Sequence, residues 1–161
     1  DGDGTFLARR VAADDWVKEP LPFARVEKLV FGPDDRVYIL YTEEHTEYIG
    51  RYPTLWVSLW FAERDGEGWS VEWLWEDEYW DAMSDIAIVE DSLVHIVLRS
   101  TYGDRVYYQR DDSGDWLTEY LFRPGYHDIS MAVAQDGQAV WHLPLRRHLQ
   151  QYEGTMKVGA R

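Results

Sequence analysis

Residues 103–121 read GDRVYYQRDDSGDWLTEYL, an apolar stretch followed by an Asp-rich turn and then a tryptophan. Two other parts of the chain are similar to it. Residues 4–21 read GTFLARRVAADDWVKEPL, and residues 68–74 read GWSVEWL. All three contain Trp-x-x-Glu-x-(apolar) after a polar turn, and their tryptophans lie 53 and 47 residues apart. Similarity at a nearly fixed spacing predicts one structural unit that is used several times.

Apolar residues elsewhere in the chain recur with a period of two. Residues 55–61 and 69–75 each carry apolar side chains at every second position, which is typical of strands buried on one face. The runs at 37–41, 86–89 and 94–98 are apolar on both faces, which predicts strands that lie between two other sheets. No segment keeps a helical period over three turns. We therefore expect an all-β fold.

Turns rich in Asp and Gly separate these runs, as they do in β-hairpins. The expected strands lie near 26–31, 36–42, 55–63, 69–75, 86–90, 94–99, 105–110, 116–121, 130–134 and 138–143. Each unit then holds four antiparallel strands in about 45–50 residues, which is the blade of a β-propeller. We expect Trp16, Trp69 and Trp116 to occupy equivalent, largely buried positions in successive blades.

The units divide the chain into about three blades. Residues 1–22 supply the outer two strands of a blade, and residues 23–81 form a blade with an inserted loop at 43–54. Residues 82–128 form a second blade, and residues 129–161 form a partial or complete last blade. Propellers need roughly four to eight blades to close a ring, so this segment is expected to be incomplete as a single chain. Its apolar flanks predict a partner, either another polypeptide that completes the propeller or a second copy of the chain.

The order of these elements resembles the BNR/Asp-box repeats of sialidase-like β-propellers. The resemblance lies in an apolar strand with an Asp-rich turn, Val-His-Ile-Val, Gly-x-x-x-Tyr-Tyr and Asp-x-Gly-x-Trp-x-x-Glu, and it covers nearly the whole chain. The box at Asp112-x-Gly114-x-Trp116 is one residue shorter than the usual Ser/Thr-x-Asp-x-Gly-x-x-Trp and lacks its leading hydroxyl. Such propellers include glycosidases, lectins and interaction modules, so the resemblance implies the fold and leaves the activity open.

Composition excludes several classes of function. The net charge is −14, from 16 basic and 30 acidic residues among 161, which disfavours nucleic acids and anionic membrane surfaces. Cysteine is absent, which excludes thiolate chemistry but leaves the compartment open, with an extracellular or periplasmic location favoured. The excess of 13 Arg over 3 Lys favours a bacterial source with a GC-rich genome. We expect no membrane insertion, no cofactor and no metal site.

Loops between second and third strands, and between one blade and the next, fall on one face, which is the usual ligand face of propellers that the sequence resembles. The candidate binding residues on this face are Tyr48, Arg51, Tyr79, Trp80, Asp81, Tyr126, His127, Arg146 and Arg147. Aromatic rings beside carboxylates suit the faces and hydroxyls of a sugar, although Trp80 would equally cover a joint between blades. The arginines suit an acidic group, with surface ion pairs as the alternative.

No catalytic set is assigned, because neither residue spacing nor the resemblance places the nucleophile of the sialidase family. The expected function is a non-enzymatic binding or assembly module that binds protein or carbohydrate through its loop face. One alternative is a section of a sialidase-like glycoside hydrolase, in which Arg51, Arg123 and Arg146 would mimic the family's arginine triad. Another is an oligomeric propeller lectin. His95 lies in a run that is apolar on both faces and is expected to be a core histidine.

Overall fold

The described residues fold into antiparallel β-sheets without any helix. The computed structural model describes residues 5–32, 36–66, 68–78, 83–89, 93–100, 105–110, 113–121, 130–133, 139–142 and 154–156. The strands are β1 (Phe6–Ala12), β2 (Asp15–Pro20), β3 (Arg25–Phe31), β4 (Val37–Ile49), β5 (Tyr52–Asp65), β6 (Gly68–Glu78), β7 (Met83–Ile88), β8 (Val94–Arg99), β9 (Arg105–Arg110), β10 (Trp116–Leu121), β11 (Ser130–Val133), β12 (Ala139–His142) and β13 (Gly154–Met156). The all-β prediction is confirmed.

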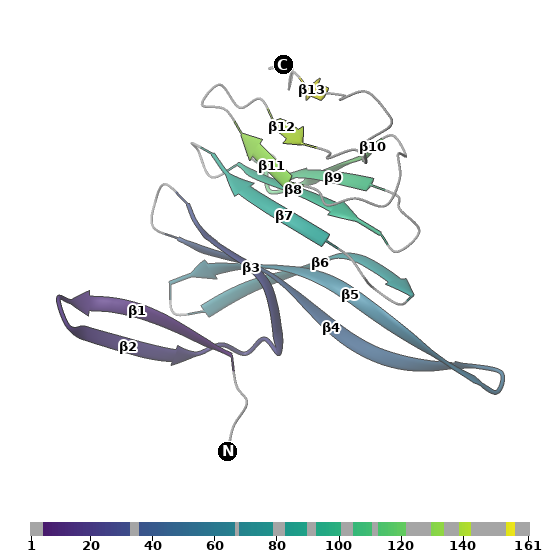
Figure 1. Cartoon of the computed structure of the whole chain (residues 1–161), viewed down its shortest axis with the longest axis horizontal. Coiled ribbons are helices and arrows are strands. Elements are labelled where there is room, and N and C mark those ends of the chain that lie inside the picture. The colour runs from purple at the N-terminus through teal and green to yellow at the C-terminus, as the bar shows by residue number, and fades with distance from the viewer. Residues whose placement is uncertain are drawn as a thin grey trace, which may run out of the picture.

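The strands form four sheets, which we call blades 1 to 4 in sequence order. Blade 1 is the β1–β2 hairpin, blades 2 and 3 are the four-stranded meanders β3–β6 and β7–β10, and blade 4 is β11–β12–β13. Within each blade, consecutive strands pair in antiparallel fashion, and no sheet closes on itself. Figure 1 shows the blades following one another from the N-terminal hairpin to the C-terminal sheet. The described chain is thus an open, blade-like segment, as expected from the sequence.

The first strands of blades 2, 3 and 4 lie side by side. Strand β7 contacts both β3 and β11. Asp85 of β7 links all three strands, because it accepts a hydrogen bond from the backbone N–H of Met131 at 3.0 Å and lies 3.7 Å from the Nζ atom of Lys28. Innermost strands that neighbour one another, with later strands spreading outward, are the radial arrangement of propeller blades.

The strand predicted at 37–41 lies between two cores, as the sequence indicates. In β4, Tyr38 and Leu40 belong to a core shared with Ile96 and other residues of blade 3. The alternate residue Ile39 belongs to a second core, which it shares with Phe23 in the connection that follows β2. Because successive side chains of a strand point to opposite faces, the middle strands of blade 2 contribute to both cores.

Segment 43–54, expected as an inserted loop, is instead a regular hairpin. Strands β4 and β5 remain paired from Tyr38 opposite Glu63 to Ile49 opposite Tyr52. The strands extend further than the sequence indicates because residues 43–53 are exposed on both faces of the hairpin. A two-sided exposed ribbon carries no alternating apolar stripe, which is the signal on which strand prediction depends.

The alternation expected along β6 is interrupted by a bulge. Trp60 lies opposite Trp73 and Leu59 opposite Trp75, so Leu74 is the extra residue. The bulge turns Leu74 into the core between blades 2 and 3, whereas Trp73 is 55% exposed. The prediction that Trp73 shares a buried face with Trp75 is therefore wrong.

The three tryptophans of the Trp-x-x-Glu units occupy matching register positions but are not equally buried. Each lies in the last strand of its blade, opposite an arginine of the preceding strand, in the pairs Trp16 with Arg10, Trp69 with Arg64 and Trp116 with Arg110. Trp69 and Trp116 are partly buried against the two cores. Trp16 is 59% exposed, so the prediction that it is largely buried is wrong. Its strand has no described blade on that side.

Replacing Leu74 with Ala should lower the free energy of unfolding by about 2–5 kcal/mol, because the truncation leaves a cavity between two blades. The neighbouring Trp73→Ala removes more atoms but should cost less than about 1 kcal/mol, since most of that side chain is in water. Urea denaturation of the two variants measures both values. A larger loss for Trp73→Ala than for Leu74→Ala would contradict the bulge.

Candidate functional site

The β4–β5 hairpin continues beyond the rest of blade 2 as a two-stranded arm, residues 46–55. Among the described residues, β3 pairs with β4 no further than Thr42, and β6 pairs with β5 no further than Trp56. Beyond those points β4 and β5 pair with each other. Figure 1 shows the arm projecting away from the stacked blades. The outer edges of the arm are therefore unpaired within the described part of the chain, and residues 46–53 are exposed.

A tight turn sets the end of the arm. Ile49 pairs with Tyr52, which leaves Gly50 and Arg51 as a two-residue turn. Gly50 has φ 69, in the left-handed region that a side chain disfavours, and it is the first turn residue, where hairpins of type II′ place glycine. No atom lies within 4 Å of a Cβ built on Gly50, so the requirement for glycine comes from the backbone angle and not from crowding.

Exposed apolar side chains gather at the end of the arm. Tyr48, Ile49 and Tyr52 are 75%, 55% and 78% exposed. Tyr48 lies opposite Pro53 and Ile49 opposite Tyr52, so the two pairs project from opposite faces of the ribbon. We call Tyr48, Ile49, Arg51, Tyr52 and Pro53 the arm tip. Clustered exposed apolar residues mark interaction sites, and tyrosine and arginine are the residues that most often dominate binding energy.

The base of the arm is acidic and is tied to the neighbouring strands. Glu44 forms an ion pair with Arg25 of β3 at 2.8 Å. Ser58 donates a hydrogen bond to Glu76 of β6 at 2.7 Å, and the Nδ1 atom of His45 lies 3.9 Å from the same carboxylate. These contacts connect the base of the arm to β3 and β6.

Two of the binding residues predicted from the sequence, Tyr48 and Arg51, lie together at the arm tip. The others lie outside the described residues, and they are Tyr79, Trp80, Asp81, Tyr126, His127, Arg146 and Arg147, together with Arg123 of the candidate arginine triad. Ile49 and Tyr52 of the arm tip were not among the site residues predicted from the sequence. Their signal was available, because apolar and aromatic residues flank a Gly-Arg pair within an otherwise acidic stretch.

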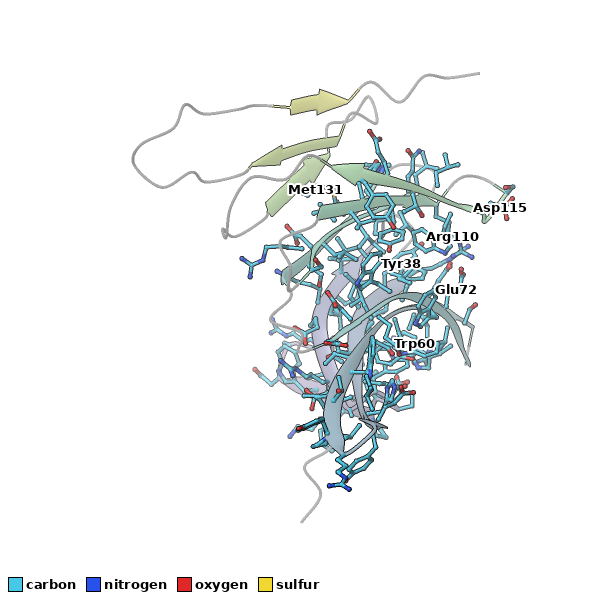
Figure 2. The ribbon with its side chains drawn as sticks, turned by 90° about the vertical axis from the view of Figure 1, so that its right-hand side faces the viewer. Tyr38, Trp60, Glu72, Arg110, Asp115 and Met131 are labelled. Atoms are coloured by element: carbon cyan, nitrogen blue, oxygen red, sulfur yellow. The ribbon has the colours of Figure 1, made fainter. Side chains whose placement is uncertain are left out.

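A second group of charged and aromatic residues joins blade 2 to blade 3. Glu72 of β6 makes two contacts with side chains of blade 3, an ion pair and a hydrogen bond. The Nη2 atom of Arg110 lies 2.8 Å from one carboxylate oxygen, and the indole N–H of Trp116 donates to the other at 2.6 Å. Arg110 also pairs with Glu63 of β5 at 2.8 Å. Figure 2 shows Glu72 and Arg110 at the same edge of the molecule.

The same arrangement joins blade 1 to blade 2. Arg64 of β5 forms an ion pair with Glu19 of β2, and its guanidinium carbon lies 5.2 Å from the centre of the Trp69 ring. We call each set an Arg–Trp–Glu joint, in which an arginine beside the tryptophan of one blade forms an ion pair with a glutamate of the preceding blade. At Glu72 the tryptophan donates a hydrogen bond as well. In a strand, residues three apart face opposite sides, which explains the Trp-x-x-Glu spacing. The missed signal was an arginine five or six positions before each of these tryptophans.

His95 is fully buried in β8, which confirms that it is a core histidine. Its Nδ1 atom lies 2.6 Å from the hydroxyl oxygen of Tyr107. Its Nε2 atom has no hydrogen-bond partner among the described residues. Burial lowers the pKa of His95 and, with a smaller contribution from the charge of Glu119, raises the pKa of Tyr107 to about 12. Both side chains are therefore neutral at neutral pH.

The buried His95 should make stability depend on pH. Because its pKa is lower in the folded protein than the ordinary 6.5, the unfolded chain binds the proton more tightly. Folded stability is then lost as the pH falls below about 6.5. Melting temperatures between about pH 7.5 and about pH 5 should fall more steeply for the wild type than for His95→Gln, which carries no titrating group at this position. Equal slopes for the two proteins would contradict this prediction.

The sequence matches no protein-family model and no curated protein. Among the described residues, no group of three or more His, Asp or Glu side chains is placed to hold a metal ion. The same part of the chain contains no helix that is both long and apolar enough to span a bilayer. The features from which a function can be proposed are the arm tip and the joints between blades.

Proposed function

We propose that the chain is a non-enzymatic β-propeller module that binds a partner and assembles into a larger propeller or protein complex. The observation that carries the proposal is the arm tip, where Tyr48, Ile49 and Tyr52 are exposed together at the end of a projecting ribbon. Three exposed apolar side chains that cluster on a structured element are typical of a surface that contacts a partner.

The shape of the arm favours a protein partner. Sugar sites are usually concave, with polar groups that converge on the ligand from several directions. The arm tip is convex, and its apolar side chains point to both faces of a thin ribbon. A convex tip with aromatic anchors fits a groove on another protein, where the side chains are desolvated from both sides.

Charge adds to this description of the partner. Glu43, Glu44 and Glu47 are exposed along the arm and its base, and the whole chain carries a net charge of −14. A partner whose groove is apolar and whose rim is basic would complement this surface. Such complementarity raises the association rate more than the affinity, so binding should be faster at low ionic strength.

Assembly is supported by a second exposed surface. Phe6 and Trp16 are exposed on the face of blade 1 that points away from blade 2, and the hairpin as a whole exposes Phe6, Val11, Trp16 and Val17. Exposed apolar flanks and strand edges of this kind favour association.

Changing both tyrosines of the arm tip, in Tyr48→Ser/Tyr52→Ser, should weaken partner binding at least about tenfold, because truncation of central aromatic residues has that effect at protein interfaces. The partner is first identified by co-purification with the full chain from cells of the source organism. Its recombinant form is then titrated against both proteins by surface plasmon resonance. Trp73→Ala is the control, since it removes another exposed aromatic residue from the body of blade 2 and should leave the affinity unchanged.

A glycan array and a panel of fluorogenic glycosides are measured with the same proteins. Glycan binding that persists in the arm variant would contradict the proposal and favour a propeller lectin. Glycoside hydrolysis would contradict it and favour a glycoside hydrolase. An affinity that is unchanged by the arm variant would place the partner elsewhere on the molecule.

A further inference from the structure

At each end of the described array, one part of an Arg–Trp–Glu joint has no described counterpart. Glu19 is held by Arg64, and Glu72 is held by Arg110 and Trp116. The remaining halves are the Arg10–Trp16 pair in blade 1 and Glu119 in blade 3.

The Arg10–Trp16 pair has no glutamate to hold among the described residues. Trp16 is largely exposed, and Arg10 donates hydrogen bonds to the carbonyls of Ala12 and Ala13 in its own turn. Arg10 lies opposite Trp16, as Arg110 lies opposite Trp116. The pair therefore has the same strand register as Arg110 and Trp116, but no described glutamate contacts it.

Glu119 is the complementary half. It is exposed on β10, three residues after Trp116, where Glu72 stands three residues after Trp69. No ion pair of Glu119 occurs within the described part of the chain. The sequence that follows β12 does not repeat the other half of the joint, because residues 143–161 contain no tryptophan.

Strand positions show which element could supply the missing half. In blades 2 and 3, the arginine and the tryptophan come from the third and fourth strands. The β1–β2 hairpin carries its arginine and tryptophan in the same way, so it corresponds to a third and a fourth strand. Blade 4 has two strands, β11 and β12, followed by the three-residue β13. The hairpin would complete it.

Within one chain this contact cannot form. The hairpin packs against blade 2, where Arg64 holds Glu19 and Phe23 after the hairpin enters the core of that blade. Figure 1 shows the hairpin and blade 4 at opposite ends of the array. A second copy of the chain has no such restriction.

We propose that two copies of the chain close a ring, in which the β1–β2 hairpin of each copy adds to β12 of the other and Arg10 and Trp16 hold Glu119 of the other copy. The added strand β1 has seven residues and takes the place of β13, which has three. Each copy then contributes two complete blades and the two parts of a composite one, so the ring has six blades, within the four to eight that close a propeller. Both contacts are the same by two-fold symmetry, so the assembly stops at two copies.

This inference rests on the assembly part of the proposed function and identifies the partner for that part as a second copy. It is independent of the arm tip, because the arm belongs to blade 2 whereas Arg10, Trp16 and Glu119 lie in blades 1 and 3. The two ideas can therefore fail separately. If the chain did not self-associate but still bound its partner through the arm, the inference would be overturned and the proposed binding function would be unaffected.

The test is a charge swap measured on the full 161-residue chain by sedimentation equilibrium and native mass spectrometry. The wild type should be a dimer of twice the 19.0 kDa chain mass. Arg10→Glu and Glu119→Arg should each weaken dimerisation at least about tenfold, because each places like charges in the joint. The double variant Arg10→Glu/Glu119→Arg should restore most of the affinity. A purely structural role of either residue would not produce that rescue.

Two controls separate the joint from general charge effects. Arg9→Glu changes the neighbouring arginine of β1, and Glu47→Arg changes an exposed glutamate of the arm, and neither should alter the dimer. Circular dichroism confirms that each variant is folded. A folded wild-type monomer, a dimer that both single reversals leave intact, or a double variant without rescue would each overturn the proposal. So would a monomer that associates with a different polypeptide.

Discussion

Arg110 holds two blades together through two carboxylates. It pairs with Glu63 and with Glu72, both at 2.8 Å, and its guanidinium carbon lies 5.7 Å from the Phe61 ring and 5.8 Å from the Trp116 ring. These side chains lie at the edge of the core between blades 2 and 3. Truncating Arg110 would leave the partly buried carboxylate of Glu72 without a cation, whereas Glu63 would keep its ion pair with Arg36. The penalty of that state exceeds the net contribution of either ion pair.

The joint also gives the array a direction. Because the tryptophan and the glutamate of Trp-x-x-Glu face opposite sides of one strand, each blade receives an acid from the blade before it and offers one to the blade after it. Such head-to-tail contacts repeat in one sense and leave complementary halves at the two sides of any open segment. The exposure of Trp16 and of Glu119 is the consequence, and it connects the packing of single blades to the way in which chains associate.

The sequence predicted the strands well where the core dictates the pattern. Residues 37–41 are apolar on both faces because they lie between two cores, and residues 94–98 are likewise fully buried, so the amino-acid pattern indicates both strands directly. It predicted the arm poorly, since a ribbon in water needs no apolar stripe, and it missed the bulge that turns Leu74 inward. Of the candidate site, Tyr48 and Arg51 were found from the position of their turn. The joint was half recognised, because Trp-x-x-Glu was visible as a repeated motif whereas its arginine lies across a turn of variable length, as between Arg64 and Trp69.

The central claim is that the Arg–Trp–Glu joint couples one blade to the next, and a double-mutant cycle on Glu72 and Arg110 tests it most directly. The free energies of unfolding of Glu72→Gln, Arg110→Met and the double variant give the coupling energy. The same cycle on the exposed pair Arg25 and Glu44 provides the reference, which should be less than about 1 kcal/mol. A coupling of about 1–3 kcal/mol between Glu72 and Arg110 is predicted, because both side chains are mostly buried and in contact. A coupling no larger than that of the exposed pair would contradict the account.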